Sequence, residues 1–522
     1  RSGKSYIIAG CIIQDSKQLN KCNYLVITTA PKETLQQQRK VFDCMQLEDF
    51  NVQVLTGANR KPKLGDKNII ICSKQFLQTK ITARSKTSRT KQITWLKNMQ
   101  FNMRFVDESH NGGATELAEK TLQVYGADVF TVQITATFSK PVRTFNIPEQ
   151  AQIKWDIEDI ELCKHLDIEK NRIRLVEKHG PEIQHCLDCY TTDQLISEYN
   201  QYPNLHVLTD RITKDTVKQI VEKTRDNHYG WSPTACFLLK QYVQNKKVQT
   251  VPEFQNPAEN LKIWYRIFGK RDEFGIPDSA YPDEQVFLSR IKRICQNPEV
   301  GSRFPGLDSG NSEPAVIMAF LPKNNIDHLS QATKQLLEQH QVIPNWDILV
   351  TNSKTTGDPK QAILDATIRA KNNCKTGVLV LTGKQCSLGV SLENCDIVLM
   401  LNNSKSFDEI FQMMFRSMSP AKNKTCGFVV DLSLSRIINF DIFKYAQQIN
   451  PTKNNKQAVQ YLLQERLINL NADHWEPSFG NAKSKLITLC NHLYTIYSKD
   501  SLAVKTRLQD LKDKYGNNLA VL

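Results

Sequence analysis

Arg1-Ser-Gly-Lys-Ser5 is followed directly by Tyr6-Ile-Ile-Ala-Gly-Cys-Ile-Ile13, which is expected to be helical. The pentapeptide matches the second half of the phosphate-binding pattern G-x-x-x-x-G-K-[ST]. In such a loop Gly3 would let backbone N–H groups surround a phosphate, and the positive end of the helix would face it. Lys4 would reach the β- and γ-phosphates, and the Ser5 hydroxyl would hold Mg²⁺. The expected nucleotide-binding residues are Ser2, Gly3, Lys4 and Ser5.

The chain begins at Arg1, without an initiator Met and inside this pattern. We therefore expect it to be a fragment or a processed product, with the first glycine of the pattern before residue 1. A targeting signal could have been lost in the same way.

Short apolar runs alternate with helical stretches in both halves of the chain. The expected strands are 24–28, 68–72, 104–106, 129–134, 315–320, 346–350, 377–381, 396–401 and 427–430. This alternation predicts an α/β fold with two domains, each a parallel sheet with helices on its faces. Irregular signals and Pro-bearing turns between them predict a connector or inserted subdomain. The expected regions are 1–150, 151–310, 311–435 and, as a helical extension, 436–522.

Length and composition limit the class of protein. At roughly 100 to 200 residues per domain, 522 residues predict about three domains. Hydrophobic residues make up 40% and charged residues 23%, which excludes a disordered chain. Apolar runs such as Ala315–Leu321 are far shorter than the roughly 18 residues of a membrane-spanning helix, so we expect no membrane partner. The net charge of +14 favours a polyanionic partner, with nucleic acid first.

The 14 cysteines are too dilute for a disulfide scaffold, and several, such as Cys72, stand in apolar runs. They predict an intracellular, reducing compartment such as the cytoplasm. Cys186-Leu-Asp-Cys189, with His179 and His185 beside it, could be half of a zinc site. No second pair at suitable spacing is visible, so plain thiols are the favoured interpretation.

Phe105-Val-Asp-Glu-Ser-His110 places two carboxylates and an imidazole at the end of an expected strand. Asp107 would position Mg²⁺, and Glu108 would orient and deprotonate the attacking water. An Asp-Glu pair in a solvated turn is the alternative. The G-K-S sequence about 100 residues upstream favours the functional interpretation.

With these two motifs in place, the chain resembles a superfamily 2 helicase with a DESH box. The resemblance rests on an ordered series of segments: Gly3–Ser5, Ala30–Gln38, Asp107–His110, Ile134–Thr137, Ala315–Pro322, Leu381–Ser391 and Gln412–Arg416. Leu388-Gly-Val-Ser391 and Gln412-Met-Met-Phe-Arg-Ser-Met418 are most similar to helicases of large cytoplasmic DNA viruses. A viral origin would extend the expected compartments to a viral factory or the virion.

The resemblance implies two RecA-like P-loop domains that hold ATP and Mg²⁺ in the cleft between them. Closure on ATP and opening after hydrolysis would shift the grip on a nucleic-acid strand. The catalytic residues it implies are Asp107, Glu108, Gln412 and Arg416. The residues it implies for coupling ATP to the strand are His110, Thr135, Thr137 and Gly389. Simple capping of strand ends is the alternative for His110 and for the threonines.

Three positions depart from the family pattern. In motif VI, which Gln412–Arg416 resembles, Phe415 stands where the family has Gly, and Ser419 stands where it has a second Arg. In motif V, Ser391 replaces Asp. Arg416 is then the best-placed cation for the transition state, on the same helical face as Gln412. Lys422 and Lys424 are second choices.

Lys80 to Arg104 contains seven basic residues and no acidic one, with Trp95 among them. Positive charges so close in sequence repel one another unless phosphate groups neutralise them, so we expect this segment to contact nucleic acid. A solvated loop is the alternative. The residues expected to make the contact are Arg84, Lys86, Arg89 and Lys91. DNA is weakly favoured over RNA.

The sequence thus predicts an ATP-dependent nucleic-acid helicase or translocase. One alternative is a double-stranded DNA translocase, similar to the motors of restriction or remodelling complexes, that does not separate strands. Another is a catalytically weakened scaffold that binds nucleic acid, which Ser391 and Ser419 would favour. The presence of Lys4, Asp107 and Glu108 argues against the scaffold.

Overall fold

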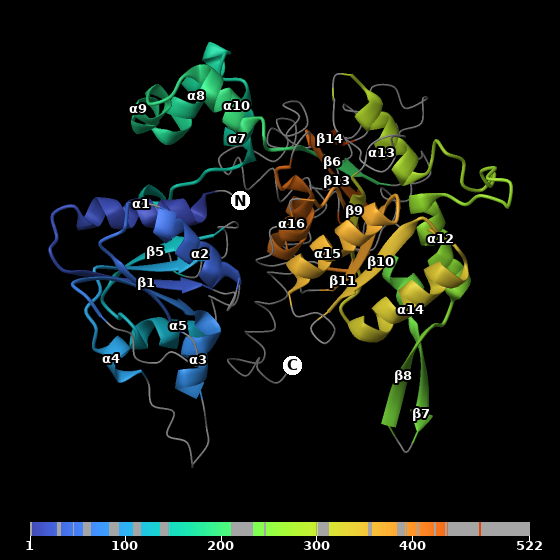
Figure 1. Cartoon of the computed structure of the whole chain (residues 1–522), viewed down its shortest axis with the longest axis horizontal. Helices are drawn as coiled ribbons and strands as arrows, with labels where there is room; N and C mark the ends of the chain where they lie inside the picture. The colour runs from blue at the N-terminus through green and yellow to red at the C-terminus, as the bar shows by residue number, and fades with distance from the viewer. Residues whose placement is uncertain are drawn as a thin grey trace, which may run out of the picture. The chain divides into compact units, whose positions relative to one another are not determined.

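The computed structural model describes two compact units, unit 1 within Arg1–Lys154 and unit 2 from Trp155 onward (Figure 1). The described residues are 3–28, 33–44, 46–55, 64–82, 93–107, 116–135, 145, 147–209, 233–244, 247–298, 300, 313–352, 358–383, 392, 394–404, 407–421, 424–433, 436 and 469–470. None of the helices among them is long and apolar enough to cross a membrane.

Unit 1 is a five-stranded parallel sheet with the strand order β2-β3-β1-β4-β5. Its strands are β1 (Cys22–Thr28), β2 (Asn51–Leu55), β3 (Lys67–Ser73), β4 (Met103–Asp107) and β5 (Phe130–Ile134). The central strand β1 pairs with β3 and with β4, so that Val26 lies opposite Ile71 and Phe105. The carboxyl ends of the strands therefore meet at one edge, which is where ligands bind in parallel α/β sheets.

Alternate residues of β1 pack on opposite faces of this sheet. Tyr24 and Val26 belong to the core under α1 (Lys4–Ser16) and α2 (Glu33–Cys44). Leu25 and Ile27 belong to the core on the other face. The helices of that second face are α3 (Lys74–Thr82), α4 (Thr94–Lys97) and α5 (Glu116–Val124), as Figure 1 shows. A strand that is buried on both faces has a continuous run of apolar residues in its sequence. This is why the sequence predicts strands at 24–28 and 68–72.

Arg104 of β4 is buried, and its guanidinium holds the end of α5. Nη1 donates to the carbonyl oxygens of Leu122, Tyr125 and Gly126 at 2.6, 2.7 and 2.7 Å. Burial lowers the pKa of Arg104 to about 10. The expectation that the basic run to Arg104 is one nucleic-acid surface is therefore wrong for this residue, because its charge is used inside the unit. Trp95 likewise packs against the core.

Unit 2 is built on a seven-stranded parallel sheet with the order β10-β11-β9-β12-β13-β6-β14. Its strands are β6 (Asn204–Leu208), β9 (Ala315–Phe320), β10 (Trp346–Thr351), β11 (Gly377–Thr382), β12 (Ile397–Met400), β13 (Cys426–Asp431) and β14 (Asn469–Leu470). All residues of β9, β11, β12 and β13 are buried.

The helices of unit 2 cover this sheet on both of its faces. They are α12 (Pro257–Phe268), α13 (Phe287–Gln296), α14 (Ile326–Gln339), α15 (Pro359–Asn372) and α16 (Phe407–Met414). Trp264 of α12 is fully buried in a cluster with Ile317 of β9 and Leu336 of α14. α15 lies against β10 and β11, with Ile363 and Ala366 buried.

A hairpin of β7 (Leu239–Gln244) and β8 (Lys247–Phe254) extends from unit 2, as Figure 1 shows. Leu239 and Phe254 at its base belong to the core of the unit. Toward its tip, Val243 and Val248 pair across the strands and are exposed. A short 3-10 helix, η2 (Pro233–Phe237), precedes it.

Four short helices precede β6. They are α7 (Ile157–Lys164), α8 (Glu169–His179), α9 (Glu182–Asp188) and α10 (Thr192–Tyr199), with η1 (Glu149–Ala151) just before them. Leu162, Cys163 and Leu175 form a small core of their own. Lys164 donates to the Asn204 amide oxygen of β6 at 2.6 Å, which joins these helices to the sheet of unit 2.

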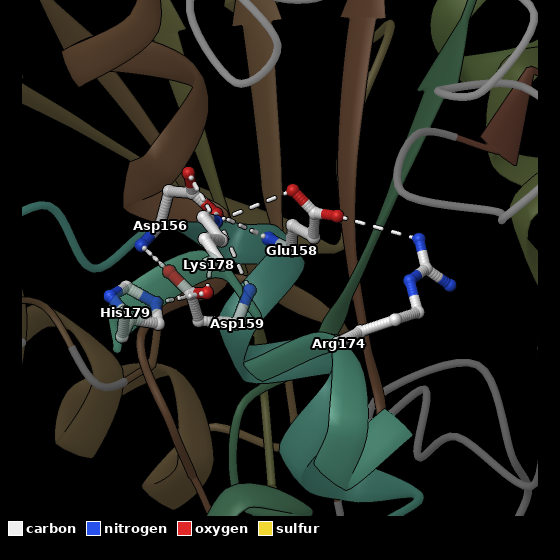
Figure 2. Close-up of polar contacts among 6 residues, drawn as sticks. All are labelled: Asp156, Glu158, Asp159, Arg174, Lys178 and His179. Carbon is white, nitrogen blue, oxygen red and sulfur yellow. Dashed lines mark hydrogen bonds and ion pairs between the residues drawn. The ribbon is translucent and has the colours of Figure 1, made fainter. Parts of the chain in front are cut away.

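Charged residues of α7 and α8 form a network around the amino end of α7 (Figure 2). Asp156 caps the helix by accepting the backbone N–H groups of Glu158 and Asp159 at 2.9 and 3.3 Å. Lys178 Nζ lies 3.0, 3.3 and 2.9 Å from oxygens of these three carboxylates. His179 Nε2 lies 2.8 Å from the buried Asp159 carboxylate.

The expected α/β fold class with two parallel, helix-covered sheets is confirmed, and so are all nine expected strands. β2, β6, the hairpin strands β7 and β8, and β14 were not expected, and β14 is a strand within the region expected to be helical. β6 belongs to the stretch expected to be a connector, yet it pairs with β13 through the partners Val207 and Val429. Of the expected helical extension 436–522, only residues 436 and 469–470 lie within the described part of the chain. The four-region division stays a prediction.

Candidate nucleotide-binding site

Gly3 is the residue before α1, and its backbone is left-handed, with φ 67° and ψ 9°. This conformation strains any residue with a Cβ, so the tight entry into the helix favours glycine. None of the described side chains caps the start of α1. The first N–H groups of a helix lack partners within the helix, and together with its dipole they attract an anion. The local geometry therefore fits the phosphate-binding loop expected here.

Asp107 ends β4 at the carboxyl edge of the sheet and is only 5% exposed. Its Oδ1 lies 3.9 Å from Lys4 Nζ at the start of α1. Two residues 103 positions apart in the sequence, both expected to bind the nucleotide or its metal, thus lie in ion-pair contact. The β4–β5 register pairs Asp107 with Ile134, so Thr135 follows at the same edge.

Gln38 of α2 is the third side chain at this point, and the sequence did not predict its contact. It is fully buried, and its Nε2 donates to Asp107 Oδ2 at 3.2 Å. The only signal in the sequence was its place in Ala30–Gln38, the segment that resembles motif Ia. Within the described residues, Gln38 Oε1 is buried without a hydrogen-bond partner.

The donor set at this site fits Mg²⁺. Asp107 and Ser5 offer a carboxylate and a hydroxyl oxygen, the hard ligands that Mg²⁺ prefers, and Mg²⁺ commonly uses one or two carboxylates together with substrate phosphates and water. The described residues contain no group of three or more His, Cys, Asp or Glu side chains that could hold a metal.

Several expected site residues lie outside the described residues. They are Ser2, Glu108, His110, Thr137, Gly389, Arg84, Lys86, Arg89 and Lys91. Their roles stay predictions.

Gln412 and Arg416 lie at the end of α16 in unit 2, but not on one continuous α-helix. Gln412 is buried on α16, which ends at Met414. Arg416 lies in the 3-10 helix η4 (Phe415–Met418). The expectation of a shared α-helical face is thus wrong, since the turn tightens between them. The Phe411 and Phe415 rings lie 4.2 Å apart, which gives the unexpected Phe415 a packing role.

η4 packs closely on β13 at a glycine. A Cβ on Gly427 would lie 2.4 Å from the Ser417 carbonyl oxygen, so no larger residue fits without a shift of the backbone. This close contact fixes the position of the turn that carries Arg416.

Lys424, one of the second-choice cations, already has buried partners. Its Nζ donates to the carbonyl oxygens of Cys395 and Ser419 at 2.6 and 3.1 Å. A buried ammonium in such contacts is costly to withdraw, which favours Arg416. Lys422 lies outside the described residues.

Arg436 forms a buried cluster at the carboxyl ends of β12 and β13 that the sequence did not predict. Its Nε and Nη2 donate to the Asp431 carboxylate at 2.6 and 2.8 Å. Its Nη2 and Nη1 also donate to the carbonyl oxygens of Met400 and Asn402 at 2.8 and 2.5 Å. The Asn402 amide contacts Met413 Sδ at 3.2 Å, which links this cluster to α16.

Cys186 and Cys189 are exposed free thiols, and Cys189 Sγ bonds to the carbonyl oxygen of His185. The His179 ring forms a hydrogen bond with the Asp159 carboxylate. The described part of the chain contains no metal-binding group that includes them. Plain thiols stay the favoured interpretation.

Residues 2–140, within unit 1, match the family described as "Type III restriction enzyme, res subunit". No curated protein matches the chain. No comparison bears on the likeness to viral helicases, which stays a prediction.

Two solved structures are among those similar to the chain. The "ATP-dependent Type ISP restriction-modification enzyme LlaBIII bound to DNA" is 11% identical with a TM-score of 0.47, over 99% of this chain and 33% of that one. A fragment of a putative HsdR subunit of a type I restriction enzyme from Vibrio vulnificus YJ016 is 11% identical with a TM-score of 0.36, over 81% and 55%. The chain spans about a third of the length of the first structure and about half of the second.

Proposed function

We propose that this chain is a Mg²⁺-dependent ATPase that uses ATP hydrolysis to move along nucleic acid. The observation that carries the proposal is the contact of Lys4 with Asp107, at a left-handed glycine and a free helix start. These features gather at the carboxyl edge of a parallel sheet, where α/β proteins bind nucleotides. The match of residues 2–140 to the family of the res subunit of type III restriction enzymes supports the same activity.

In the proposed mechanism the start of α1 binds the β- and γ-phosphates through its backbone N–H groups. Lys4 adds the positive charge of its ammonium group. When the nucleotide binds, this group would turn from Asp107 toward the phosphates. Ser5 and Asp107 would hold Mg²⁺, which when bound neutralises charge on the phosphates. Glu108 orients the attacking water and accepts its proton. The roles of Gln412 and Arg416 in hydrolysis stay predictions from the resemblance, with Arg416 expected to counter the charge of the transition state.

Nucleic acid is the proposed track because the chain carries a net charge of +14. Neutralising backbone phosphates releases counterions and gives affinity without sequence preference. We favour DNA over RNA, because the family that residues 2–140 match is named for restriction enzymes.

A double-stranded DNA translocase that does not separate strands is a second candidate, and the same family match favours it. Strand-displacement and triplex-displacement assays distinguish the two. A motor that displaces a triplex strand but leaves a forked duplex intact is the translocase.

The test of the shared proposal is the rate of ATP hydrolysis measured in parallel with single-stranded DNA, duplex DNA and RNA. We expect stimulation by at least one of them. A chain that hydrolyses no ATP with any of the three would leave the binding scaffold as the better account.

A further inference from the structure

The Asp107 carboxylate is contacted from two sides by side chains of two different helices. Lys4 Nζ of α1 lies 3.9 Å from Oδ1, and Gln38 Nε2 of α2 lies 3.2 Å from Oδ2. Lys4 has an assigned role toward phosphate, whereas Gln38 has none at the nucleotide. Its side chain is buried and contacts the proposed metal ligand.

The orientation of the Gln38 amide follows from chemistry. An ionised carboxylate only accepts hydrogen bonds, so the NH₂ group must face Asp107 and the amide oxygen must point elsewhere. That oxygen, Oε1, has no hydrogen-bond partner among the described residues although it is buried. A buried acceptor without a donor destabilises the fold, so a donor that arrives with a ligand would be favoured there.

Bound Mg²⁺ would bring such a donor. Mg²⁺ keeps several water molecules when it binds through one or two carboxylates and phosphates. These waters donate hydrogen bonds outward, and the side chains that accept them orient the ion. Oε1 is on the same amide group as the Nε2 that contacts Asp107, so it lies beside the proposed metal ligand.

We propose that Gln38 is a positioning residue of the metal site: its NH₂ group holds the Asp107 carboxylate, and its oxygen accepts from a Mg²⁺-bound water. The inference rests on the proposed function of this site. α2 is well placed for the task because Phe42, one turn after Gln38, is buried in the core between helix and sheet. Packing of Phe42 holds α2 on the sheet, and Gln38 of the same helix contacts Asp107.

The test compares Gln38→Met, which keeps the side-chain size but removes both polar atoms, with the wild type. The probe is ADP, titrated by calorimetry once with Mg²⁺ and once with EDTA. Side chains that orient a metal ligand typically change metal affinity by about 10- to 100-fold. We expect the gain in ADP affinity from Mg²⁺ to fall about tenfold in Gln38→Met, with the affinity in EDTA changed less than about twofold. Gln14→Met, at an exposed glutamine of α1, is the matched control and should behave as wild type.

Thermal unfolding shows whether Gln38→Met is folded. If it is not folded, the titration is repeated with Gln38→Asn, which keeps the amide group on a side chain shorter by one methylene. An unchanged effect of Mg²⁺ overturns the inference, and so does an equal loss of affinity with Mg²⁺ and with EDTA, which would indicate a structural role. Failure of the proposed function is distinguishable, since the wild type itself would then bind no ADP.

Discussion

The carboxylate network around α7 predicts an unusual dependence of stability on pH. Burial, together with the nearby Asp159 and Glu158 charges, raises the pKa of Asp156 to about 6, and Lys178 offsets this only in part. In the unfolded chain the pKa is close to 3.8. The folded state therefore binds the proton more tightly, and protonation of Asp156 stabilises these helices. This stability is complete below about pH 4 and is lost as the pH rises through about 6.

The magnitude follows from the size of the shift. One pKa unit corresponds to about 1.4 kcal/mol, so a shift of about two units would give close to 3 kcal/mol. Three carboxylates share one lysine here, so we expect about 1–3 kcal/mol. Asp159 acts in the opposite direction: its hydrogen bond from His179 and the charge of Lys178 outweigh burial and lower its pKa, so its contribution is lost below about pH 4. Between pH 4 and 6 the Asp156 effect should dominate.

Asp156→Asn isolates the effect, because asparagine caps a helix about as well as aspartate and carries no charge. Hydrogen exchange of the α7 and α8 amides, corrected for intrinsic rates, measures the opening free energy of these helices between pH 5 and 8. We expect Asp156→Asn to be more stable than wild type at pH 7.5 and to lose the pH dependence. Asp167→Asn, at an exposed carboxylate, is the control. A less stable Asp156→Asn at pH 7.5, with a flat wild-type profile, would refute the reasoning.

Three further predictions concern unit 2 and the nucleic-acid contact. Arg436→Met leaves Asp431 buried without its ion pair, so unit 2 should lose about 3–5 kcal/mol in urea unfolding, and a loss below about 1 kcal/mol would contradict the buried pair. Arg416→Ala should lower kcat at least about a hundredfold with little change in nucleotide affinity, whereas a normal kcat would show that another residue supplies the cation. Binding to DNA should weaken as the salt concentration rises. Replacing four basic residues with Gln should flatten the slope of the logarithm of the binding constant against the logarithm of the salt concentration, and an unchanged slope would indicate a solvated loop. The four positions are Arg84, Lys86, Arg89 and Lys91.

The sheets could be predicted because their strands are buried on both faces. Runs such as Ala315–Phe320 are apolar throughout, which is typical of a parallel strand under helices. β2 was missed because Asn51 and Gln53 interrupt the apolar pattern of an edge strand. β6 was missed because His206 stands in its centre and because its partner β13 lies more than 200 residues away.

The candidate site was predictable to the extent that two short motifs define it. Gly3, Lys4 and Asp107 were identified from their sequence patterns, and the fold places Lys4 against Asp107. The contact of Gln38 with Asp107 could not be derived, because it depends on how α2 lies over the end of β4. The cluster of Arg436 with Asp431 depends in the same way on the packing of two strand ends.

The central claim is that Lys4 and Asp107 belong to an ATPase site driven by nucleic acid. The most direct test is the steady-state rate of ATP hydrolysis by the wild type and by Lys4→Ala, each without nucleic acid and with single-stranded DNA, duplex DNA or RNA. The account predicts hydrolysis that DNA stimulates in the wild type and no hydrolysis above background in Lys4→Ala. Equal turnover by the two proteins, or none by the wild type with any nucleic acid, would contradict it.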